Sequence, residues 1–430
     1  MPYPELGRQS SNRSSDCWVA LATNESVIKR VFIPLEPARA LLSPKTTNRI
    51  NLTLSVSEQK KLFTPGPLCV SQTVKEAMLT DYGSRDVQFI DTVKYIRSKL
   101  VEIAGVSSSS FSAVPLQGSG SYAVEAVLQT VTSRENGKIL ILANGAYGKR
   151  MDKMCEVSNL PRKTILFPEN EKVDPKVVER ELKADQSYTC VAIVHCETSS
   201  GVINPVESIG KLTKDLLPNA AYFVDAMSSF GAIPLDIEES KVDYLVSSAN
   251  KCLEGVPGFS YAIARISHLL TCEGFCRSYS LDLVDQYKNL EKTSQFRFTP
   301  PTHTMLAFKQ ALVEYERDGG IAGRAGRYQA NRKILRDGMK AIGFKELLDD
   351  SHEGYIITSF YFPKDKNFDF SVFYQKLSDL GQVIYPGKVL NADCFRIGNI
   401  GNIYPEDMHH LMKCVLQVLT EMNVEVPVRN

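Results

Sequence analysis

The stretch AYFVDAMSSFGAIPLDIEESKVDYLVSSANKCLEGVPG (221–258) contains two short apolar runs, AYFV and YLV, each followed by small and polar residues. Runs of this length, rich in aliphatic and aromatic residues, are typical of strands that are buried on both faces. Asp225 ends the first run, and Lys251 follows the second. The stretch therefore predicts two strands of a buried sheet, with a carboxylate at the end of one and an amine just beyond the end of the other.

Strands and helices alternate in the region around this stretch. Two further runs, KILILAN (138–144) and CVAIVH (190–195), predict buried strands. Amphipathic patterns predict helices at YAVEAVLQTV (122–131), PKVVERELKA (175–184) and PVESIGKLTKDLL (205–217). Such alternation favours right-handed crossovers and an α/β fold, with a large, mostly parallel sheet and helices on both faces. Ligands of such sheets bind beyond the carboxyl ends of the strands.

The two ends of the chain differ from this central region. Residues 1–56 are rich in Ser, Thr, Asn and Arg without sustained apolar periodicity, and they predict a flexible N-terminal extension. Residues 57–310 form the predicted large domain. Residues 311–430 predict a smaller α+β domain, with strands at YIITSFYFP and DCFRIGN (355–363, 393–399) and helices at FSVFYQKLSDLG and MHHLMKCVLQVLTEM (370–381, 408–422).

Composition excludes several classes of protein. The 430 residues include 50 basic and 49 acidic side chains, and 43% are hydrophobic, as in an ordinary globular protein. The net charge of +1 gives no field that would attract nucleic acid or an anionic membrane. The ten cysteines contain no CxxC pair, so we expect no metal site and reduced thiols in the cytoplasm, with the mitochondrion as the alternative.

Asp225 and Lys251 indicate a specific cofactor when they are considered as a pair. Alone, the first could be a capping residue and the second a solvated lysine. One crossover apart, they are predicted on neighbouring βα loops. Pyridoxal 5′-phosphate needs a lysine for its Schiff base and a carboxylate beside its pyridine nitrogen. The run GSGS (118–121) before a predicted helix adds small residues and N–H groups that suit a phosphate.

Several runs stand in the order found in one enzyme family: GSGSYAVEA, ANGAYGKR, HCETSSGVINP, VDAMSSFGAIPLDI, SSANKCLEGVPGFS and RFTPPTH. From about residue 60 to 425 the chain resembles the class V aminotransferases of fold-type I. Within that family it is most similar to the 2-aminoethylphosphonate–pyruvate transaminases. The resemblance implies a pyridoxal 5′-phosphate enzyme with a large sheet domain and a smaller C-terminal domain, acting as a homodimer. It implies ping-pong transfer of the amino group of 2-aminoethylphosphonate to pyruvate, giving phosphonoacetaldehyde and L-alanine.

The resemblance also implies roles for individual residues. Lys251 would carry the cofactor and move the proton, and Asp225 would pair with the pyridine nitrogen. The other expected cofactor contacts are Ser119, Gly120 and Ser121 at the phosphate, Tyr147 and Met227 on the two ring faces, Thr198 or Ser200 at the ring oxygen, and Thr299 from the other subunit. Ser121 departs from the Thr that is frequent in the family but keeps the hydroxyl.

An anion-binding arginine is expected at the substrate end of the site. Arg396, in the run FRIGN, would hold the substrate carboxylate or phosphonate, since a guanidinium matches the oxygens of such groups. The run FTPGPL (63–68) would close over the same end through Thr64 and Gly66. Arg85 is a second candidate for an anion contact.

Three alternatives remain open at this stage. An alanine–glyoxylate or serine–pyruvate aminotransferase would share the fold, although such relatives usually carry Trp where this chain has Tyr147. A cysteine desulfurase needs a cysteine on a mobile loop, whereas Cys394 lies in a predicted strand. A catalytically inactive binding protein would have little reason to retain Lys251, Asp225 and Arg396 together.

Overall fold

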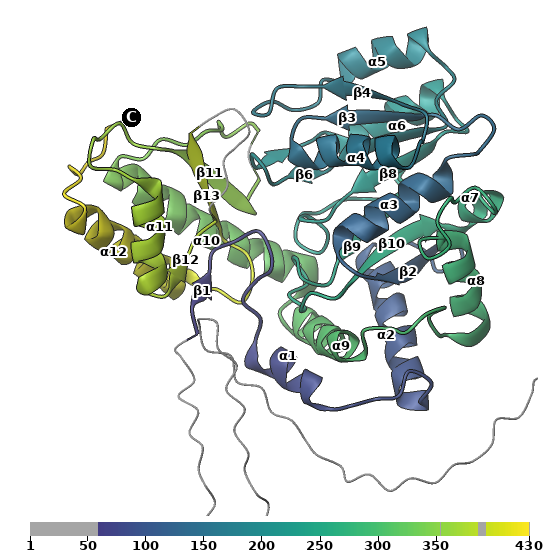
Figure 1. The fold of residues 1–430 in the computed structure, drawn as a ribbon, viewed down its shortest axis with the longest axis horizontal. Coiled ribbons are helices and arrows are strands. Elements are labelled where there is room, and N and C mark those ends of the chain that lie inside the picture. The colour runs from purple at the N-terminus through teal and green to yellow at the C-terminus, as the bar shows by residue number, and fades with distance from the viewer. Residues whose placement is uncertain (1–58, 353, 386–392, 430) are drawn as a thin grey trace, which may run out of the picture. The chain divides into compact units, whose positions relative to one another are not determined.

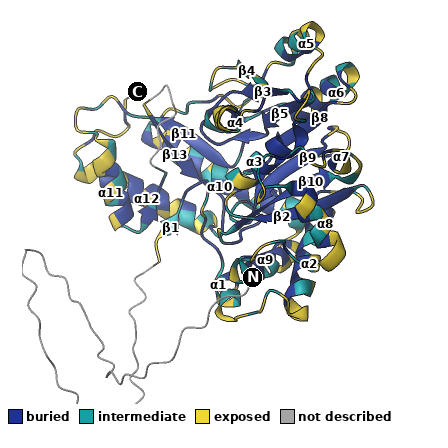
Figure 2. Ribbon diagram, turned by 45° about the vertical axis from the view of Figure 1, so that its right-hand side comes forward, coloured by how far each residue is buried: buried dark blue, intermediate teal, exposed yellow. Residues whose placement is uncertain are grey.

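The large sheet is built from the buried apolar runs of the chain. The computed structural model describes residues 59–352, 354–385 and 393–429, and the predicted extension, residues 1–56, lies outside them. The four predicted strands lie side by side as β3 (Ile139–Ala143), β5 (Cys190–Val194), β8 (Ala221–Asp225) and β9 (Tyr244–Ser248). Every residue of these four strands is buried, which explains why polar side chains are rare in them (Figure 2).

Three more strands complete the sheet of seven, whose order is β2-β10-β9-β8-β5-β3-β4. They are β2 (Phe111–Gln117), β4 (Arg162–Leu166) and β10 (Phe259–Arg265). β10 runs antiparallel to both of its neighbours, and all other pairs are parallel. The α/β class and the mostly parallel sheet are therefore confirmed (Figure 1).

One detail of the predicted topology is wrong. Asp225 and Lys251 were expected on βα loops, but residues 226–243 and 249–258 contain turns and no α-helix. β9 instead connects directly to the antiparallel β10. The two residues still lie close together because β8 and β9 are neighbouring parallel strands whose carboxyl ends meet at one edge.

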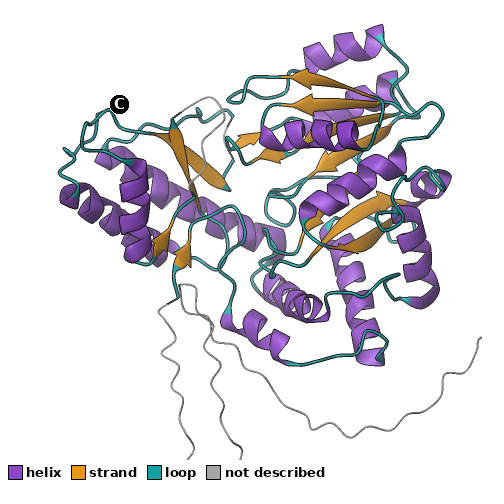
Figure 3. Ribbon diagram, viewed as in Figure 1, coloured by secondary structure: helices purple, strands orange, loops and turns teal. Residues whose placement is uncertain are grey.

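Helices flank the large sheet (Figure 3). Their bounds are α2 (Val87–Ile103), α3 (Gly120–Val131), α4 (Ala146–Val157), α5 (Pro175–Ala184), α6 (Val206–Leu216), α7 (Ile266–Thr271), α8 (Leu283–Thr293) and α9 (Thr302–Arg317). The three helices predicted in this region are confirmed as α3, α5 and α6. Of the helices in the described part of the chain, none is long and apolar enough to cross a membrane.

A smaller group of elements follows along the chain. It consists of α10 (Gly320–Ile342), β11 (Ile357–Tyr361), α11 (Phe370–Asp379), β12 (Gln382–Val383), β13 (Cys394–Gly398) and α12 (Pro405–Glu421). β11 and β13 pair antiparallel. The two strands and two helices predicted in this region are all confirmed, as β11, β13, α11 and α12.

The first described residues pack with this smaller group. β1 (Lys61–Leu62) pairs in parallel with β12, and Phe63 shares a buried cluster with Phe360, Phe395 and Val415. The chain then passes through α1 (Gln72–Glu76) and η1 (Ala77–Leu79), which pack on α9. The segment between β1 and α1 thus runs from the smaller group of elements to the large sheet.

The carboxyl ends of several strands meet at one edge of the sheet. β3, β8 and β9 are parallel to one another, and β2 runs in the direction of β9 because both are antiparallel to β10. α3 follows β2, α4 follows β3, and a short hairpin of β6 (Cys196–Glu197) and β7 (Val202–Ile203) follows β5. These connections carry most of the predicted site residues.

Candidate active site

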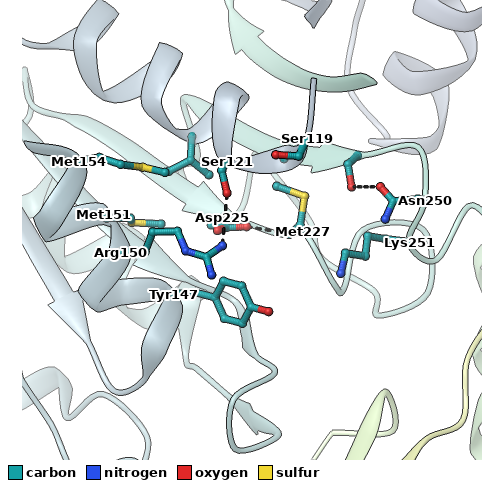
Figure 4. A pocket seen from close by; sticks show the side chains of 13 residues that line it. Ser119, Ser121, Tyr147, Arg150, Met151, Met154, Asp225, Met227, Asn250 and Lys251 are labelled. Carbon is teal, nitrogen blue, oxygen red and sulfur yellow. Dashed lines mark hydrogen bonds between the residues drawn. The ribbon is translucent and has the colours of Figure 1, made fainter. Parts of the chain in front are cut away.

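A cavity of ≈ 210 Å³ lies at this edge of the sheet (Figure 4). Its lining includes residues from four connections: Ser119, Gly120 and Ser121 at the start of α3, Tyr147 and Arg150 on α4, Asp225 and Met227 after β8, and Lys251 after β9. Seven of these eight residues were predicted from the sequence, and Arg150 was not. The structure therefore gathers most of the expected cofactor-binding residues around one space, with Thr198 and Thr299 outside its lining.

Lys251 lies on the wall of the cavity with its amine removed from bulk water. Burial lowers the pKa of this amine, while Cys252 and Asp225 act in the opposite direction. Its Nζ donates a hydrogen bond of 2.8 Å to the Pro65 carbonyl oxygen. A lysine held in this way keeps a larger neutral fraction than a solvated one, as a nucleophile or base requires.

Gly66 permits the close approach of this segment to Lys251. Its φ is +123°, and a Cβ atom would lie 2.8 Å from Lys251 Nζ and 3.0 Å from the Asn250 carbonyl oxygen. Thr64, by contrast, donates its hydroxyl to the Pro67 carbonyl oxygen at 2.6 Å. The structure thus places Gly66 against the lysine and ties the Thr64 side chain to its own loop.

Asp225 is a buried carboxylate with few partners. It is 4% exposed, and its Oδ1 accepts a hydrogen bond of 2.9 Å from the Met227 backbone N–H. Within the described residues no cation pairs with it. Burial and the nearby Glu197 raise its pKa to about 6, although the Met227 N–H, Lys251 and Arg150 act in the opposite direction. A positive group entering the cavity would relieve the cost of this burial.

The start of α3 provides an anion site. Ser119 is the N-cap residue, and its side chain accepts no capping hydrogen bond from the helix, so the first N–H groups and the positive end of the helix dipole remain available. A Cβ atom on Gly120 would lie 2.2 Å from Met227 Cε, so only glycine lets the methionine approach here. Ser121 adds a hydroxyl that accepts a hydrogen bond of 3.2 Å from Arg150 Nη1.

Tyr147 and Arg150 lie on the same face of α4. The Arg150 guanidinium lies 4.8 Å from the centroid of the Tyr147 ring, as residues three apart on a helix can. Burial raises the pKa of Tyr147, and a hydrogen bond with Thr198 lowers it. The i, i+3 spacing after Tyr147 was the sequence signal that could have identified Arg150.

Arg396 lies on β13 and is 6% exposed. Its Nη1 donates 2.7 Å to the Thr198 carbonyl oxygen, and its guanidinium lies 4.7 Å from the Tyr385 ring centroid. Burial lowers the pKa of this arginine, and Tyr385, Tyr147 and Glu197 counteract the effect. Its Nε finds no acceptor among the described residues. A buried guanidinium with an unused donor suits an anionic ligand.

Seven predicted residues lie outside the cavity lining of this chain: Thr64, Gly66, Arg85, Thr198, Ser200, Thr299 and Arg396. Thr299 is exposed, and its carbonyl oxygen accepts 3.1 Å from Gln117 Nε2. Arg85 is exposed in the turn before α2. Ser200 is buried, and its hydroxyl donates to the Glu197 carbonyl oxygen at 3.4 Å.

A group of cavity features fits pyridoxal 5′-phosphate. Asp225 is a buried acid without a cation among the described residues, α3 presents uncapped N–H groups beside Gly120, and Lys251 has a desolvated amine. These are the three groups that the pyridine nitrogen, the phosphate and the aldehyde of that cofactor require. In the described part of the chain, no three His, Cys, Asp or Glu residues cluster as metal ligands.

Comparison with known proteins agrees with this geometry. The family model "Aminotransferase class-V" matches residues 72–376. The chain is 47% identical to the 2-aminoethylphosphonate–pyruvate transaminase of Bacteroides fragilis, across 82% of this chain and 97% of that protein. It is 49% identical to the enzyme of the same name from Klebsiella pneumoniae, across 82% of this chain and 96% of that protein.

A solved structure shares the fold. Pyridoxamine–pyruvate aminotransferase from Mesorhizobium loti superposes with a TM-score of 0.77 at 24% identity, covering 86% of this chain and 94% of that one. The predicted fold-type I architecture, with a large flanked sheet and a smaller C-terminal part, is confirmed by this likeness.

Proposed function

The chain belongs to the class-V aminotransferase family, and we propose that it transfers the amino group of 2-aminoethylphosphonate to pyruvate with pyridoxal 5′-phosphate as cofactor. The products are phosphonoacetaldehyde and L-alanine. The observation that carries the proposal is the cavity shared by Lys251, Asp225 and the start of α3. The names of relatives at 47% and 49% identity, which the chain covers almost completely, support the choice of substrates.

The cavity residues divide the binding of the cofactor among them. Asp225 would accept the pyridine N–H, the Ser119–Ser121 turn and Arg150 would hold the phosphate, and Tyr147 and Met227 would contact the ring faces. When bound, pyridoxal 5′-phosphate supplies an electron sink and carries the amino group between the two substrates. The ionised form of Asp225 is the one that suits a protonated pyridine nitrogen.

Lys251 is the base in this proposal. Its amine would take the proton from the substrate carbon that bears the amino group and pass it to the cofactor in the same half-reaction, and the opposite half-reaction would run this transfer in reverse. The lowered pKa of Lys251 favours the neutral form that can accept this proton. The Pro65 carbonyl oxygen, 2.8 Å from Nζ, holds the amine at the cavity wall while it is free.

Arg396 is the anion-binding residue for both substrates. Pyruvate carries a carboxylate and 2-aminoethylphosphonate a phosphonate, and a guanidinium can hold either group by paired hydrogen bonds. The unused Nε of Arg396 provides one such donor. Because the substrates bind in turn in a ping-pong reaction, one arginine serves both half-reactions. The Thr64–Gly66 segment, which approaches Lys251 at Gly66, would close over the substrate.

The proposal includes a homodimer in which Thr299 reaches the cofactor phosphate of the other subunit. Two observations support it: Thr299 is exposed and lies outside the cavity of its own chain, and Tyr279 and Phe298 near it are 78% and 41% exposed. Mixing a Lys251→Ala subunit with a Thr299→Val subunit tests the arrangement. If Thr299 serves the other subunit, the site that keeps Lys251 receives an intact Thr299 from the Lys251→Ala chain. These hybrids should then be as active as hybrids of Lys251→Ala with wild-type chain, and lower activity would contradict the shared site.

We place the protein in the cytoplasm because the nine cysteines of the described residues are free thiols, which a reducing compartment preserves. Microscopy of a full-length fluorescent fusion tests this location. A mitochondrial signal would contradict it.

Steady-state kinetics of the full-length protein test the reaction. With pyridoxal 5′-phosphate added, we expect kcat/KM for 2-aminoethylphosphonate with pyruvate to exceed that for alanine with glyoxylate, or serine with pyruvate, by a factor of about 100. Lys251→Ala should lose at least about 10²–10⁴-fold in turnover. A higher kcat/KM with alanine and glyoxylate would contradict the proposed substrates, and an active Lys251→Ala variant would contradict the mechanism.

A further inference from the structure

Glu197, in the β6–β7 hairpin, is a fully buried acid that has no role in the proposed binding of cofactor or substrate. Its exposure is 0%, and no cation of the described residues forms an ion pair with it. Its four hydrogen-bond donors are backbone N–H groups and a hydroxyl. Burying a carboxylate in this way is costly unless all its lone pairs are used. Both of its oxygens are used, and their partners belong to two separate elements.

One carboxylate oxygen holds the start of α4. Glu197 Oε2 accepts from the backbone N–H of Tyr147 at 3.1 Å and of Gly148 at 3.4 Å. The N-cap residue of this helix, Gly145, offers no side chain for capping, so the carboxylate takes over that role from a distant strand. The negative charge also lies at the positive end of the helix dipole. The position of Tyr147 therefore depends directly on Glu197.

The other oxygen holds the hairpin itself. Glu197 Oε1 accepts from the Ser199 N–H at 3.2 Å and from the Ser199 hydroxyl at 2.6 Å. That hydroxyl in turn accepts from the Ala146 N–H at 3.1 Å. The first three N–H groups of α4 are thus all bound by one hairpin.

The same hairpin contacts the smaller group of elements. The Thr198 carbonyl oxygen accepts from Arg396 Nη1 at 2.7 Å, and the Ser200 carbonyl oxygen accepts from the Ser359 hydroxyl of β11 at 2.8 Å. The Thr198 side chain also acts on the Tyr147 hydroxyl, whose pKa it lowers. Any shift of the Glu197 carboxylate would therefore reach the ring of Tyr147 and the guanidinium of Arg396 together.

We propose that Glu197 is a positioning residue that fixes Tyr147 against the cofactor and Arg396 against the substrate in one arrangement. The inference rests on the proposed function, because that assigns Tyr147 to the cofactor ring and Arg396 to the substrate anion. Glu197 touches neither ligand in this account and acts through α4 and the hairpin.

Two substitutions disturb the carboxylate in different ways. Glu197→Gln keeps the shape but turns one acceptor into an N–H₂ group that faces existing donors. Gly145→Ala keeps the glutamate at position 197 but puts a Cβ atom 2.4 Å from the Glu197 Cγ and Cδ atoms. The carboxylate must therefore move. Asp243→Asn is the matched control: Asp243 is a 3% exposed carboxylate near the amino end of β9, away from the cavity lining.

The test compares these full-length variants by titration with pyridoxal 5′-phosphate and by steady-state kinetics. For Glu197→Gln we expect the cofactor Kd and the KM for pyruvate each to rise about tenfold, as removal of a supporting hydrogen-bond partner does elsewhere, with a smaller fall in kcat. The absorbance maximum of the bound cofactor should shift. Gly145→Ala should reproduce this pattern, and Asp243→Asn should lower the melting temperature with Kd and KM unchanged.

Two results would overturn the proposal. One is a Glu197→Gln protein whose Kd and KM stay within twofold of wild type. The other is a pattern like that of Asp243→Asn, with lower thermal stability alone. The cofactor titration needs no amino donor. A wild-type protein that binds the cofactor but does not react with 2-aminoethylphosphonate would therefore count against the proposed substrate only. The cofactor Kd values of wild type and Glu197→Gln would still test the role of Glu197.

Discussion

Asp225 and Asp243 lie at opposite ends of the β8–β9 pair and are equally hidden, with exposures of 4% and 3%. Asp243 accepts hydrogen bonds from Lys214 Nζ at 2.6 Å, Arg265 Nε at 2.8 Å and the Tyr222 N–H at 2.9 Å. Asp225 has the Met227 N–H and no cation among the described residues. Two carboxylates of the same burial therefore have opposite surroundings.

The difference separates a structural acid from a functional one. Asp243 is neutralised by its own chain, so it stabilises the fold. In the cofactor-free protein the ionised form of Asp225 is unfavourable, and its pKa is therefore raised to about 6. A positive ligand group would remove this electrostatic cost. A buried acid at the carboxyl edge of a parallel sheet without a cation of its own marks the place where a ligand supplies one.

The largest expected effect comes from removing the charge of Asp225. Asp225→Asn should lower kcat/KM by about 10²–10³-fold, because a preorganised charge opposite the pyridine nitrogen is lost. Thermal stability of the cofactor-free protein at pH 7 should stay the same or rise, since the cost of a buried unpaired charge disappears. Steady-state kinetics measure the expected fall in kcat/KM, and thermal unfolding measures the stability of the cofactor-free protein. A stability loss without an activity loss would reverse the roles given to Asp225 and Asp243.

The pH dependence of stability isolates the cost that Asp225 carries. In the folded protein its pKa is about 6, above the ordinary value of 3.8 that applies to the unfolded chain. The folded state therefore binds the proton more tightly than the unfolded state. The wild type should therefore lose about 3 kcal/mol relative to Asp225→Asn as the pH rises from about 4 to about 6, and remain level above that. Denaturant unfolding of both cofactor-free proteins across this range measures it. Parallel pH profiles would contradict the raised pKa.

Asp243→Asn should have the opposite signature. Lys214 and Arg265 would both lose their ion-pair partner, and we expect the free energy of unfolding to fall by about 2 kcal/mol. The loss is smaller than for a fully buried ion pair because both cations are partly exposed. Activity per folded molecule should remain within twofold of wild type. Denaturant unfolding and active-site titration together check this, and a loss of kcat in fully folded protein would count against a structural role.

The smallest effect concerns Arg150, the cation on α4 that shares the cavity with Asp225. Arg150→Ala should raise the cofactor Kd about tenfold, because one charge-assisted hydrogen bond to the phosphate is lost. Lys149→Ala is the matched control, since the neighbouring Lys149 is paired with Glu169 at 3.1 Å on the surface. Titration with pyridoxal 5′-phosphate measures both. Equal Kd values for the two variants would remove Arg150 from the phosphate site.

The sequence predicted those parts of the site that depend on local pattern. Apolar runs located β8 and β9 within a few residues, and the parallel pairing of these strands was enough to bring Asp225 and Lys251 together. The GSGS turn identified the start of α3 because its small residues precede a strong amphipathic pattern. Resemblance to a family then added Tyr147 and Met227, which line the cavity.

The parts that were missed depend on distant partners. Asp225 and Asp243 both adjoin apolar runs in the sequence, and only the folded chain shows which one receives cations. Glu197 acts on backbone N–H groups fifty residues away along the chain, and backbone donors leave no signature in a sequence. The absence of helices between β8, β9 and β10 was likewise hidden, because the turn-rich connections resemble loops that lead into helices.

The donor half-reaction shows whether 2-aminoethylphosphonate is the amino donor. The full-length protein, loaded with pyridoxal 5′-phosphate, is mixed with 2-aminoethylphosphonate alone, and its visible absorbance is followed. We expect loss of the visible band as the cofactor takes up the amino group, release of phosphonoacetaldehyde, and recovery of the band when pyruvate is added. A band that ignores 2-aminoethylphosphonate but is bleached by alanine or serine would contradict the proposed donor.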